Sequence, residues 1–277
     1  MGALQLKTGP NSGVKKVAGV VVHLATHLGA WYLLAMVIPF ATYVLPFPHN
    51  VVGSLFENDT ILKVPNILWI GQQLLITIRD ASIGFVVGIG LAIVLAVVML
   101  FFPGMRDVVL RDSVAIRSVP WIVLVPILMM IMGTGAITAI TLICLSVFFF
   151  TLVNFYTGLL EVDQDVLDYT RTLSGITDWI TFTKVRWYYA LPYLFAALKT
   201  TASVVILTAV VIEWLMGREG LGYLLYTFNY RYRMDLLLAL AVVAGLASYC
   251  FMRAVTGLES LVVDESVWRG GKSEQRI

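Results

Sequence analysis

The stretch that decides the fold runs from residue 118 to residue 160 and reads SVPWIVLVPILMMIMGTGAITAITLICLSVFFFTLVNFYTGLL. It contains no Asp, Glu, Lys or Arg over 43 residues. One membrane-spanning helix needs about 20 mostly apolar residues. The segment is therefore long enough for two crossings. Its middle, Gly133-Thr134-Gly135, has the glycines that a tight turn between two helices uses.

Four further runs of the chain also lack charged side chains: 17–56, 81–105, 200–212 and 236–252. The last two runs become long enough to span a membrane when their apolar flanks are included. The sequence therefore predicts an all-α integral membrane protein with about six transmembrane helices. We expect these helices at 18–45, 78–102, 113–132, 136–159, 191–217 and 235–257.

The overall composition supports a membrane protein. The 277 residues carry 19 Lys and Arg and 17 Asp and Glu, so 13% of the chain is charged, about half the roughly 25% of a soluble domain. The mean hydropathy is +0.88. These values argue against a disordered chain and against a soluble enzyme. A net charge of +2 is also too small to suggest nucleic-acid binding.

The distribution of positive charges predicts the orientation. Fourteen of the 19 Lys and Arg side chains fall on the side of the two termini and of the second and fourth connections, and five fall on the other side. Positive charge is enriched in cytoplasmic loops. We therefore expect both termini in the cytoplasm of a prokaryote, in a multi-pass plasma-membrane protein (the inner membrane in a Gram-negative cell). The predicted organisation is a cytoplasmic tail over 1–16, a permease domain over 17–260 and a cytoplasmic tail over 261–277.

The sequence contains no motif typical of catalysis or of cofactor binding. His23 and His27 share a helix face, but a zinc site needs a third ligand and the metalloprotease glutamate is absent. Cys144 and Cys250 fall within predicted spans and are expected to be small buried residues. No nucleotide-binding or nucleophile-elbow motif occurs. We expect no catalytic residue, no metal and no cofactor in this chain.

Two ionisable residues fall inside the predicted fifth span. Such groups are costly in a bilayer and are usually paired, hydrated or functional. Lys199 is expected near the cytoplasmic end, where its side chain can reach water. Glu213 either bonds to backbone or to Arg218, or acts as a gate or partner contact. Other residues that could line a pathway or simply pack between helices are Asn154, Thr201, Ser203 and Thr208, together with Gly220 and Gly222 beyond the span.

The connection 161–190 is the longest on the predicted cytoplasmic side. It begins with acidic residues and continues to Gly175, which can adopt a left-handed conformation. Thr177 can cap a second helix. That helix would carry one apolar stripe of Trp179, Phe182 and Val185. The pattern predicts an amphipathic helix-turn-helix that either lies on lipid or fits a soluble partner.

Several motifs together resemble the permease subunits of bacterial ABC importers. The resemblance is to the branch that serves nitrate, bicarbonate, taurine and other sulfonates, and it covers almost the whole chain. The motifs are Leu45-Pro46-Phe47-Pro48, the segment 115–126 with its Arg117, Pro120 and Pro126, Gly133-Thr134-Gly135, Asn154 with Gly158 and Asp163, and Glu213 with Gly220-Leu221-Gly222-Tyr223.

The family's ATPase-coupling element falls on the 161–190 connection. Gly175, Phe182 and Val185 match its spacing. The segment Asp168-Tyr169-Thr170-Arg171 stands where the family has Glu-Ala-Ala, and Trp187-Tyr188 stands where it has Leu-Pro. These departures leave the individual coupling contacts open. They also suggest the divergent half of a heterodimeric permease.

The resemblance implies a type I importer permease that is itself not an enzyme. It implies a second permease copy or related partner, an extracytoplasmic substrate-binding protein, and cytoplasmic ATPase subunits that bind ATP and Mg. It further implies a small solute such as nitrate, a sulfonate, taurine, bicarbonate or a small organic acid. The alternative is a self-sufficient channel or secondary transporter, and a membrane enzyme is the third possibility.

Overall fold

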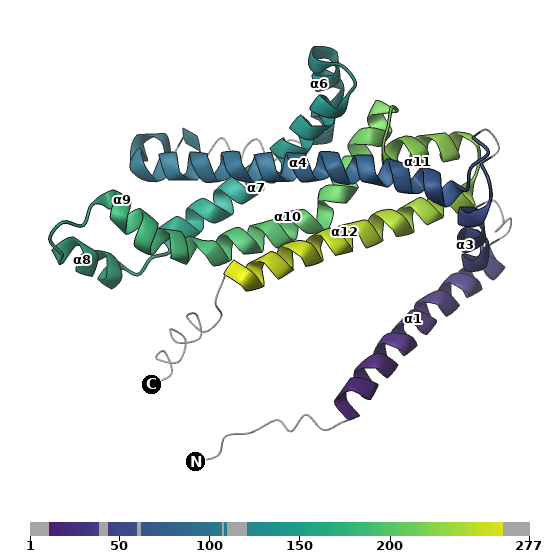
Figure 1. The fold of residues 1–277 in the computed structure, drawn as a ribbon, viewed down its shortest axis with the longest axis horizontal. Helices are drawn as coiled ribbons and strands as arrows, with labels where there is room; N and C mark the ends of the chain where they lie inside the picture. Colours follow the sequence, from purple (N-terminus) through teal and green to yellow (C-terminus); the bar gives the residue numbers. More distant parts are fainter. Residues whose placement is uncertain (1–10, 39–43, 60–61, 107, 110–120, 263–277) are drawn as a thin grey trace. The chain divides into compact units, whose positions relative to one another are not determined.

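The described part of the chain is all-α, as predicted. The computed structural model describes residues 11–38, 44–59, 62–106, 108–109 and 121–262. Within them the only β pairing is an isolated bridge between Asn58 and Pro65. The helices (Figure 1) are α1 (Asn11–Val37), α3 (Pro48–Phe56), α4 (Asn66–Phe101), η1 (Trp121–Val123), α6 (Leu124–Met132), α7 (Ala136–Leu160), α8 (Gln164–Thr172), α9 (Asp178–Thr181), η2 (Phe182–Arg186), α10 (Trp187–Met216), α11 (Leu221–Tyr230) and α12 (Met234–Val262).

Four described helices are long and apolar enough to cross a membrane. They are Asn66–Phe101, Ala136–Leu160, Asp178–Met216 and Met234–Val262, and Val21–Val37 is a shorter apolar helix. These helices correspond to five of the six predicted spans. Of the predicted span 113–132, residues 113–120 lie outside the described residues, and η1 and α6 form the rest. Gly133, with φ of +80°, makes the predicted turn before α7.

The largest differences from the predicted boundaries are the starts of two spans. Helix α4 begins at Asn66 rather than at 78, because the uncharged stretch 66–77 continues the helix before the Arg79–Asp80 ion pair at 2.7 Å. The fifth span does not begin at 191 but continues back without a break to Asp178. A single rod of 39 residues results, roughly 58 Å long at 1.5 Å per residue. Residues 1–10 of the predicted tail 1–16 and residues 263–277 of the predicted tail 261–277 lie outside the described residues, and α1 already begins at Asn11.

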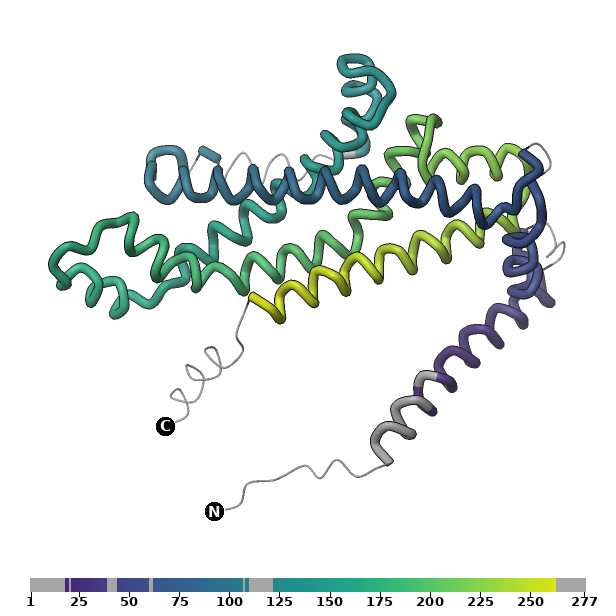
Figure 2. The backbone as a smooth tube through the Cα atoms, viewed as in Figure 1, coloured from purple at the N-terminus to yellow at the C-terminus, as the bar shows by residue number. Residues whose placement is uncertain are grey.

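The chain divides into two compact units. The larger comprises 70–226 and 240–277, and the smaller comprises 1–69 and 227–239. In the larger unit α7 packs along α10, and Figure 2 shows α8 and α9 as the turn that joins them. Helix α4 approaches α7 closely because Gly84 and Gly88 lie against Ile143 and the carbonyl of Cys144. Small residues four apart allow this kind of contact between membrane helices.

The smaller unit is built around α3. The Trp31 ring nitrogen of α1 donates to the carbonyl of Pro46 at 3.1 Å. The Tyr32 hydroxyl lies 3.0 Å from His49 Nδ1, and the two rings stack. These contacts hold α1 to α3, while most of the α1 surface from residue 21 onwards is exposed. Neither α3 nor α11 was predicted from the sequence.

Candidate functional site

The 161–190 connection forms the predicted helix-turn-helix. The Asp163 carboxylate accepts a hydrogen bond from the amide of Asp165 at 3.2 Å and caps α8. The Thr177 hydroxyl accepts from the amide of Ile180 at 3.3 Å and caps α9. Gly175 has φ of +84°, a conformation that favours glycine. The turn between the helices therefore depends on this residue.

The outer surface of α8 carries charged and aromatic side chains. Tyr169 is 65% exposed, and Asp168 and Arg171 form an exposed ion pair at 3.0 Å. Thr170 is buried, and its hydroxyl donates to the carbonyl of Leu167 at 2.7 Å. Of the four residues 168–171, which differ from the Glu-Ala-Ala of the family motif, three thus face outward and are accessible to a partner.

A chain of aromatic rings connects α9 to the helices of the bundle. Phe182 is buried and lies 5.9 Å from the ring of Phe101 in α4, 5.3 Å from Trp179 and 6.1 Å from Trp187. Trp187 in turn lies 5.6 Å from Phe155 in α7. The predicted apolar stripe is only partly buried, since Trp179 is 58% exposed and Val185 is half-buried. Trp179 also lies 5.8 Å from the ring of Phe101, so Phe182 is the buried centre of the contact between the helix-turn-helix and the bundle.

A second constellation surrounds Glu213 near the end of α10. Its Oε2 accepts hydrogen bonds from the Thr77 hydroxyl at 2.8 Å and from the amide of Gly222 at 3.0 Å. Glu213 is only 4% exposed. The carboxylate therefore holds the turn before α11 against α4. This geometry agrees with the backbone-bonded interpretation of Glu213, and Arg218 instead donates to the carbonyl of Thr134.

Helix α4 contributes the opposite side of this Glu213 clamp. The Gln73 side-chain oxygen accepts from the amide of Gly220 at 2.7 Å, and the Thr77 oxygen accepts from the amide of Leu221 at 2.9 Å. Three consecutive amides, 220 to 222, are thereby satisfied by side chains from α4 and α10. Gly220 has φ of +90° and passes directly against the Glu213 carboxylate. Sequence reasoning identified Glu213, Gly220 and Gly222 but missed Gln73 and Thr77.

Replacement of Glu213 by glutamine is expected to leave the fold intact, whereas alanine is not. The amide oxygen of glutamine can accept both bonds now made to Oε2, and its nitrogen would take the place of Oε1, which has no hydrogen-bond partner among the described residues. Glu213→Ala leaves the buried Gly222 amide without its acceptor, at about 1–3 kcal/mol, and leaves the Thr77 hydroxyl only the longer bond to the carbonyl of Gln73 at 3.2 Å. In detergent, the thermal unfolding temperatures of wild type and Glu213→Gln should be similar, and both should be well above that of Glu213→Ala. Equal destabilisation by both changes would contradict this account.

The other pathway candidates bond mainly within their own helices. The Asn154 side chain donates to the carbonyl of Phe150 at 2.7 Å, Thr201 to Ala197 at 2.9 Å and Ser203 to Thr200 at 2.7 Å. Thr201 is buried, and Asn154, Ser203 and Thr208 are half-buried. They lie on α7 and α10, and they remain predictions as pathway residues.

Lys199 has a partner that the sequence did not reveal. Its ammonium group lies 2.8 Å from the Glu259 carboxylate, which comes from α12, 60 residues later. The Lys199 side chain is 37% exposed and that of Glu259 is 24% exposed. The pair joins α10 to α12, so Lys199 does more than extend toward water.

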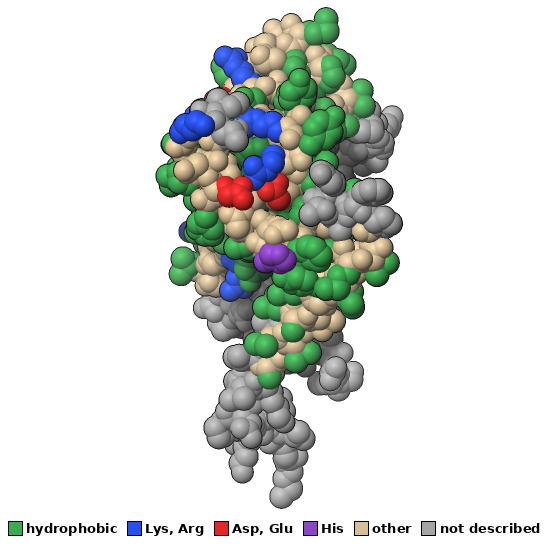
Figure 3. Space-filling view, turned by 90° about the vertical axis from the view of Figure 1, so that its right-hand side faces the viewer, with side chains coloured by type: hydrophobic (Ala, Val, Ile, Leu, Met, Phe, Trp, Pro, Cys, Tyr) green, Lys and Arg blue, Asp and Glu red, His purple; other side chains and the backbone are tan. Residues whose placement is uncertain are grey.

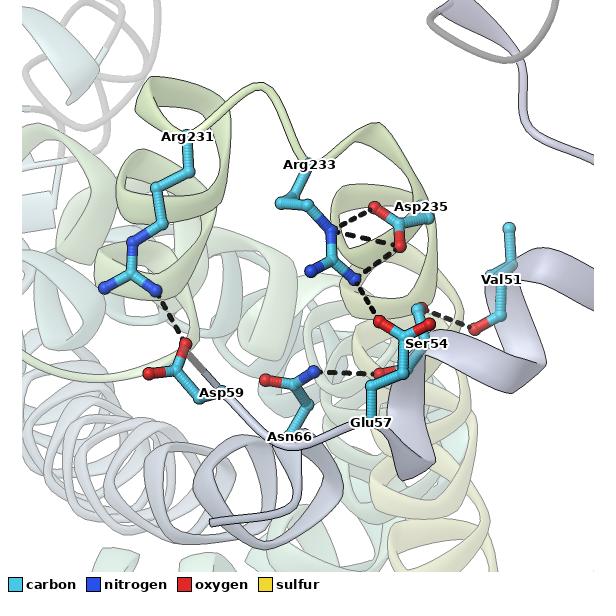
Figure 4. A network of polar contacts seen from close by, with 8 residues as sticks. All are labelled: Val51, Ser54, Glu57, Asp59, Asn66, Arg231, Arg233 and Asp235. Atoms are coloured by element: carbon cyan, nitrogen blue, oxygen red, sulfur yellow. Dashed lines mark hydrogen bonds and ion pairs between the residues drawn. The ribbon is translucent and has the colours of Figure 1, made fainter. Parts of the chain in front are cut away.

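An ion-pair network in the smaller unit was also missed (Figure 4). Arg233 donates to both Asp235 oxygens and contacts Glu57 at 2.8 Å, and Arg231 contacts the buried Asp59 at 2.6 Å. The hydrogen bond to Asp235 raises the pKa of the Arg233 guanidinium above its ordinary value. Figure 3 shows acidic side chains beside Lys and Arg side chains on the face it presents. The network fixes the turn between α11 and α12 to the segment after α3.

Comparison with known proteins places this geometry among transport proteins. Residues 75–263 match the family described as binding-protein-dependent transport system inner membrane component. A "Probable ABC transporter permease protein" of Haemophilus influenzae is 28% identical over 82% of this chain and 89% of its own length. The nitrate import permease protein NrtB of Synechocystis sp. is 25% identical over 90% of each chain. A chain of the inward-facing MetNI methionine ABC transporter has the same fold, with a TM-score of 0.58 and 21% identity over 72% of this chain and 98% of its own.

Proposed function

Because the chain belongs to the family of binding-protein-dependent transport system inner membrane components, we propose that it is the transmembrane permease subunit of an ATP-driven importer of a small solute. In this proposal it forms the substrate pathway and couples to cytoplasmic ATPase subunits. The exposed helix-turn-helix of 161–190 receives the ATPase. The chain itself hydrolyses nothing, and ATP and Mg are bound by the partner.

The observation that carries the coupling role is the continuity of the rod Asp178–Met216. Its first residues belong to the helix-turn-helix, and its last turn carries the Glu213 clamp. A displacement of α9 would therefore reach the turn at Gly220 through one uninterrupted helical segment, which includes the π-helical stretch Phe182–Arg186 and Pro192. ATP can shift the pathway only through a difference in affinity between two arrangements. A continuous helical segment that joins the helix-turn-helix to the Glu213 clamp suits this requirement.

The orientation follows from the positive charges. With 14 of 19 Lys and Arg side chains on the side of the helix-turn-helix, that side faces the cytoplasm, and both termini lie there. The opposite side receives solute from an extracytoplasmic binding protein. A second permease, either an identical copy or a related chain, completes the pathway. The membrane is the prokaryotic plasma membrane.

The proposed solute is a small anion or small organic acid of the nitrate, sulfonate, taurine or bicarbonate type. The likeness to a nitrate import permease supports this class. Asn154, Thr201, Ser203 and Thr208 are the proposed polar positions along the pathway. A binding screen on the cognate binding protein tests the class directly.

Purification in mild detergent tests the assembly. The tagged chain is expected to co-purify with a P-loop ATPase subunit, and Gly175→Trp is expected to lose at least about 90% of it, a tenfold weakening that corresponds to ~1.4 kcal/mol. The strained turn would misplace Tyr169 and Arg171. Lys63→Trp, at an exposed site in the smaller unit with φ of +56°, is the matched control for a bulky residue at positive φ. Undiminished ATPase recovery with Gly175→Trp would contradict the assignment, and transport without any ATPase would favour a self-sufficient channel or secondary transporter.

A further inference from the structure

A crevice of about 260 Å³ lies between the end of α4 and the helix-turn-helix. Leu100, Phe101 and Pro103 form one wall. Arg171 of α8 and Arg186 of η2 line the other side, together with Asp178. The crevice is thus apolar where α4 ends and cationic where the helix-turn-helix faces it.

Both arginines keep hydrogen-bond donors for a ligand. The Arg186 guanidinium donates one bond at 2.7 Å to the carbonyl of Leu159. The Arg171 guanidinium donates one bond at 3.0 Å to Asp168, and these side chains are 73% and 67% exposed. A guanidinium carries five N–H groups. The exposed pair is also weak and readily exchanged for a stronger acceptor.

The charge of the lining favours an anion. Two guanidinium groups face one carboxylate, that of Asp178, within the crevice. Arginine binds phosphate through paired N–H donors, an arrangement that adds both energy and geometric specificity. A phosphate group between Arg171 and Arg186 would also separate two like charges that share one small space.

The location indicates the source of that phosphate. Phe101 is the last residue of α4, one of the helices long enough to span a membrane, so the crevice lies at the end of a candidate membrane span. Its volume is slightly below the ~300 Å³ at which pockets for small organic molecules begin. That space fits a lipid headgroup whose acyl chains remain outside, beyond the apolar wall.

We propose that this crevice binds the phosphate headgroup of an anionic phospholipid, with Arg171 and Arg186 as its ligands. Basic pockets beside transmembrane helices on the cytoplasmic side bind such headgroups. One headgroup would tie α8 and η2 to the end of α4. The site requires neither ATPase nor transported solute, so its test is independent of the proposed transport function.

The experiment is a titration of the full-length purified chain with short-chain phosphatidylglycerol and phosphatidylcholine, read by native mass spectrometry. Wild type is expected to retain phosphatidylglycerol in preference to phosphatidylcholine. Arg171→Gln, an exposed change that leaves the core untouched, is expected to weaken phosphatidylglycerol binding about tenfold, the loss of one charge-assisted hydrogen bond. Arg186→Lys keeps the charge but loses the paired donors, and should weaken binding as well.

Lys184→Gln is the matched control, because Lys184 is an exposed cation in the same helical segment and does not line the crevice. It should change binding by less than about threefold. Equal losses in Lys184→Gln and Arg171→Gln, or no preference for phosphatidylglycerol in wild type, would overturn the site. Displacement of the lipid by inorganic phosphate at comparable concentration would show a free-phosphate site instead and would also overturn the lipid assignment.

Discussion

Replacement of Gly220 by alanine is expected to prevent stable folding. At φ of +90° an L-residue costs about 1–2 kcal/mol, and a Cβ atom at this position would overlap the Glu213 carboxylate. The carboxylate cannot withdraw, because it is held by Thr77 and Gly222 within a buried site. The two effects together should exceed about 4 kcal/mol, the range of exceptional single substitutions. The monodisperse fraction on size-exclusion chromatography after graded heating in mild detergent measures the loss.

Gly217 offers the matched control, three residues earlier in the same turn. Its φ is +65°, but no atom lies within 4 Å of the position its Cβ would take. Gly217→Ala should therefore cost only the backbone strain of about 1–2 kcal/mol. If Gly220→Ala and Gly217→Ala lowered the unfolding temperature equally, close contact with Glu213 would not be the reason for glycine at 220.

The membrane-spanning helices could be predicted because their signal is local. An uncharged run such as 136–160 needs no knowledge of its neighbours to be recognised as a span, and α7 begins where predicted and ends one residue later. The turn at Gly175 and the cap at Thr177 were also accessible, since both depend on residue types within a few positions. The same holds for the turn at Gly133.

What escaped prediction depends on contacts between distant segments. Glu259 pairs with Lys199 across 60 residues, and Asp59 pairs with Arg231 across 172. Thr77 reaches Glu213 across 136 residues. A single amino-acid sequence does not indicate which distant residue pairs with a charged side chain; it indicates only that a charge inside a membrane span needs a partner.

Replacement of Phe182 by alanine is expected to uncouple the helix-turn-helix from the bundle while leaving the membrane spans folded. The ring is 6% exposed and contacts Phe101, Trp179 and Trp187, so its loss removes about 3–5 kcal/mol of packing. If only ~1.4 kcal/mol of this loss destabilises the state in which the helix-turn-helix packs on the bundle, the population of that state relative to the detached one drops about tenfold. Amide hydrogen exchange over 164–186 should accelerate by at least that factor, with α7 unchanged.

Phe102, which follows Phe101 at the end of α4, provides the control substitution for Phe182→Ala. It is 61% exposed, so Phe102→Ala removes the same side chain beside the same helix end without opening the core. In the proposed importer complex, ATP hydrolysis stimulated by the loaded binding protein should survive Phe102→Ala and fall at least about tenfold in Phe182→Ala. Stimulation at the wild-type level in Phe182→Ala, with the ATPase still bound, would mean that the movement of the ATPase reaches the bundle without the Phe182 ring. The substitution leaves in place the backbone of the rod Asp178–Met216, the contact of Trp179 with Phe101 and the hydrogen bond from Arg186 to the carbonyl of Leu159. The variant therefore separates transmission through the Phe182 ring from transmission by these other connections.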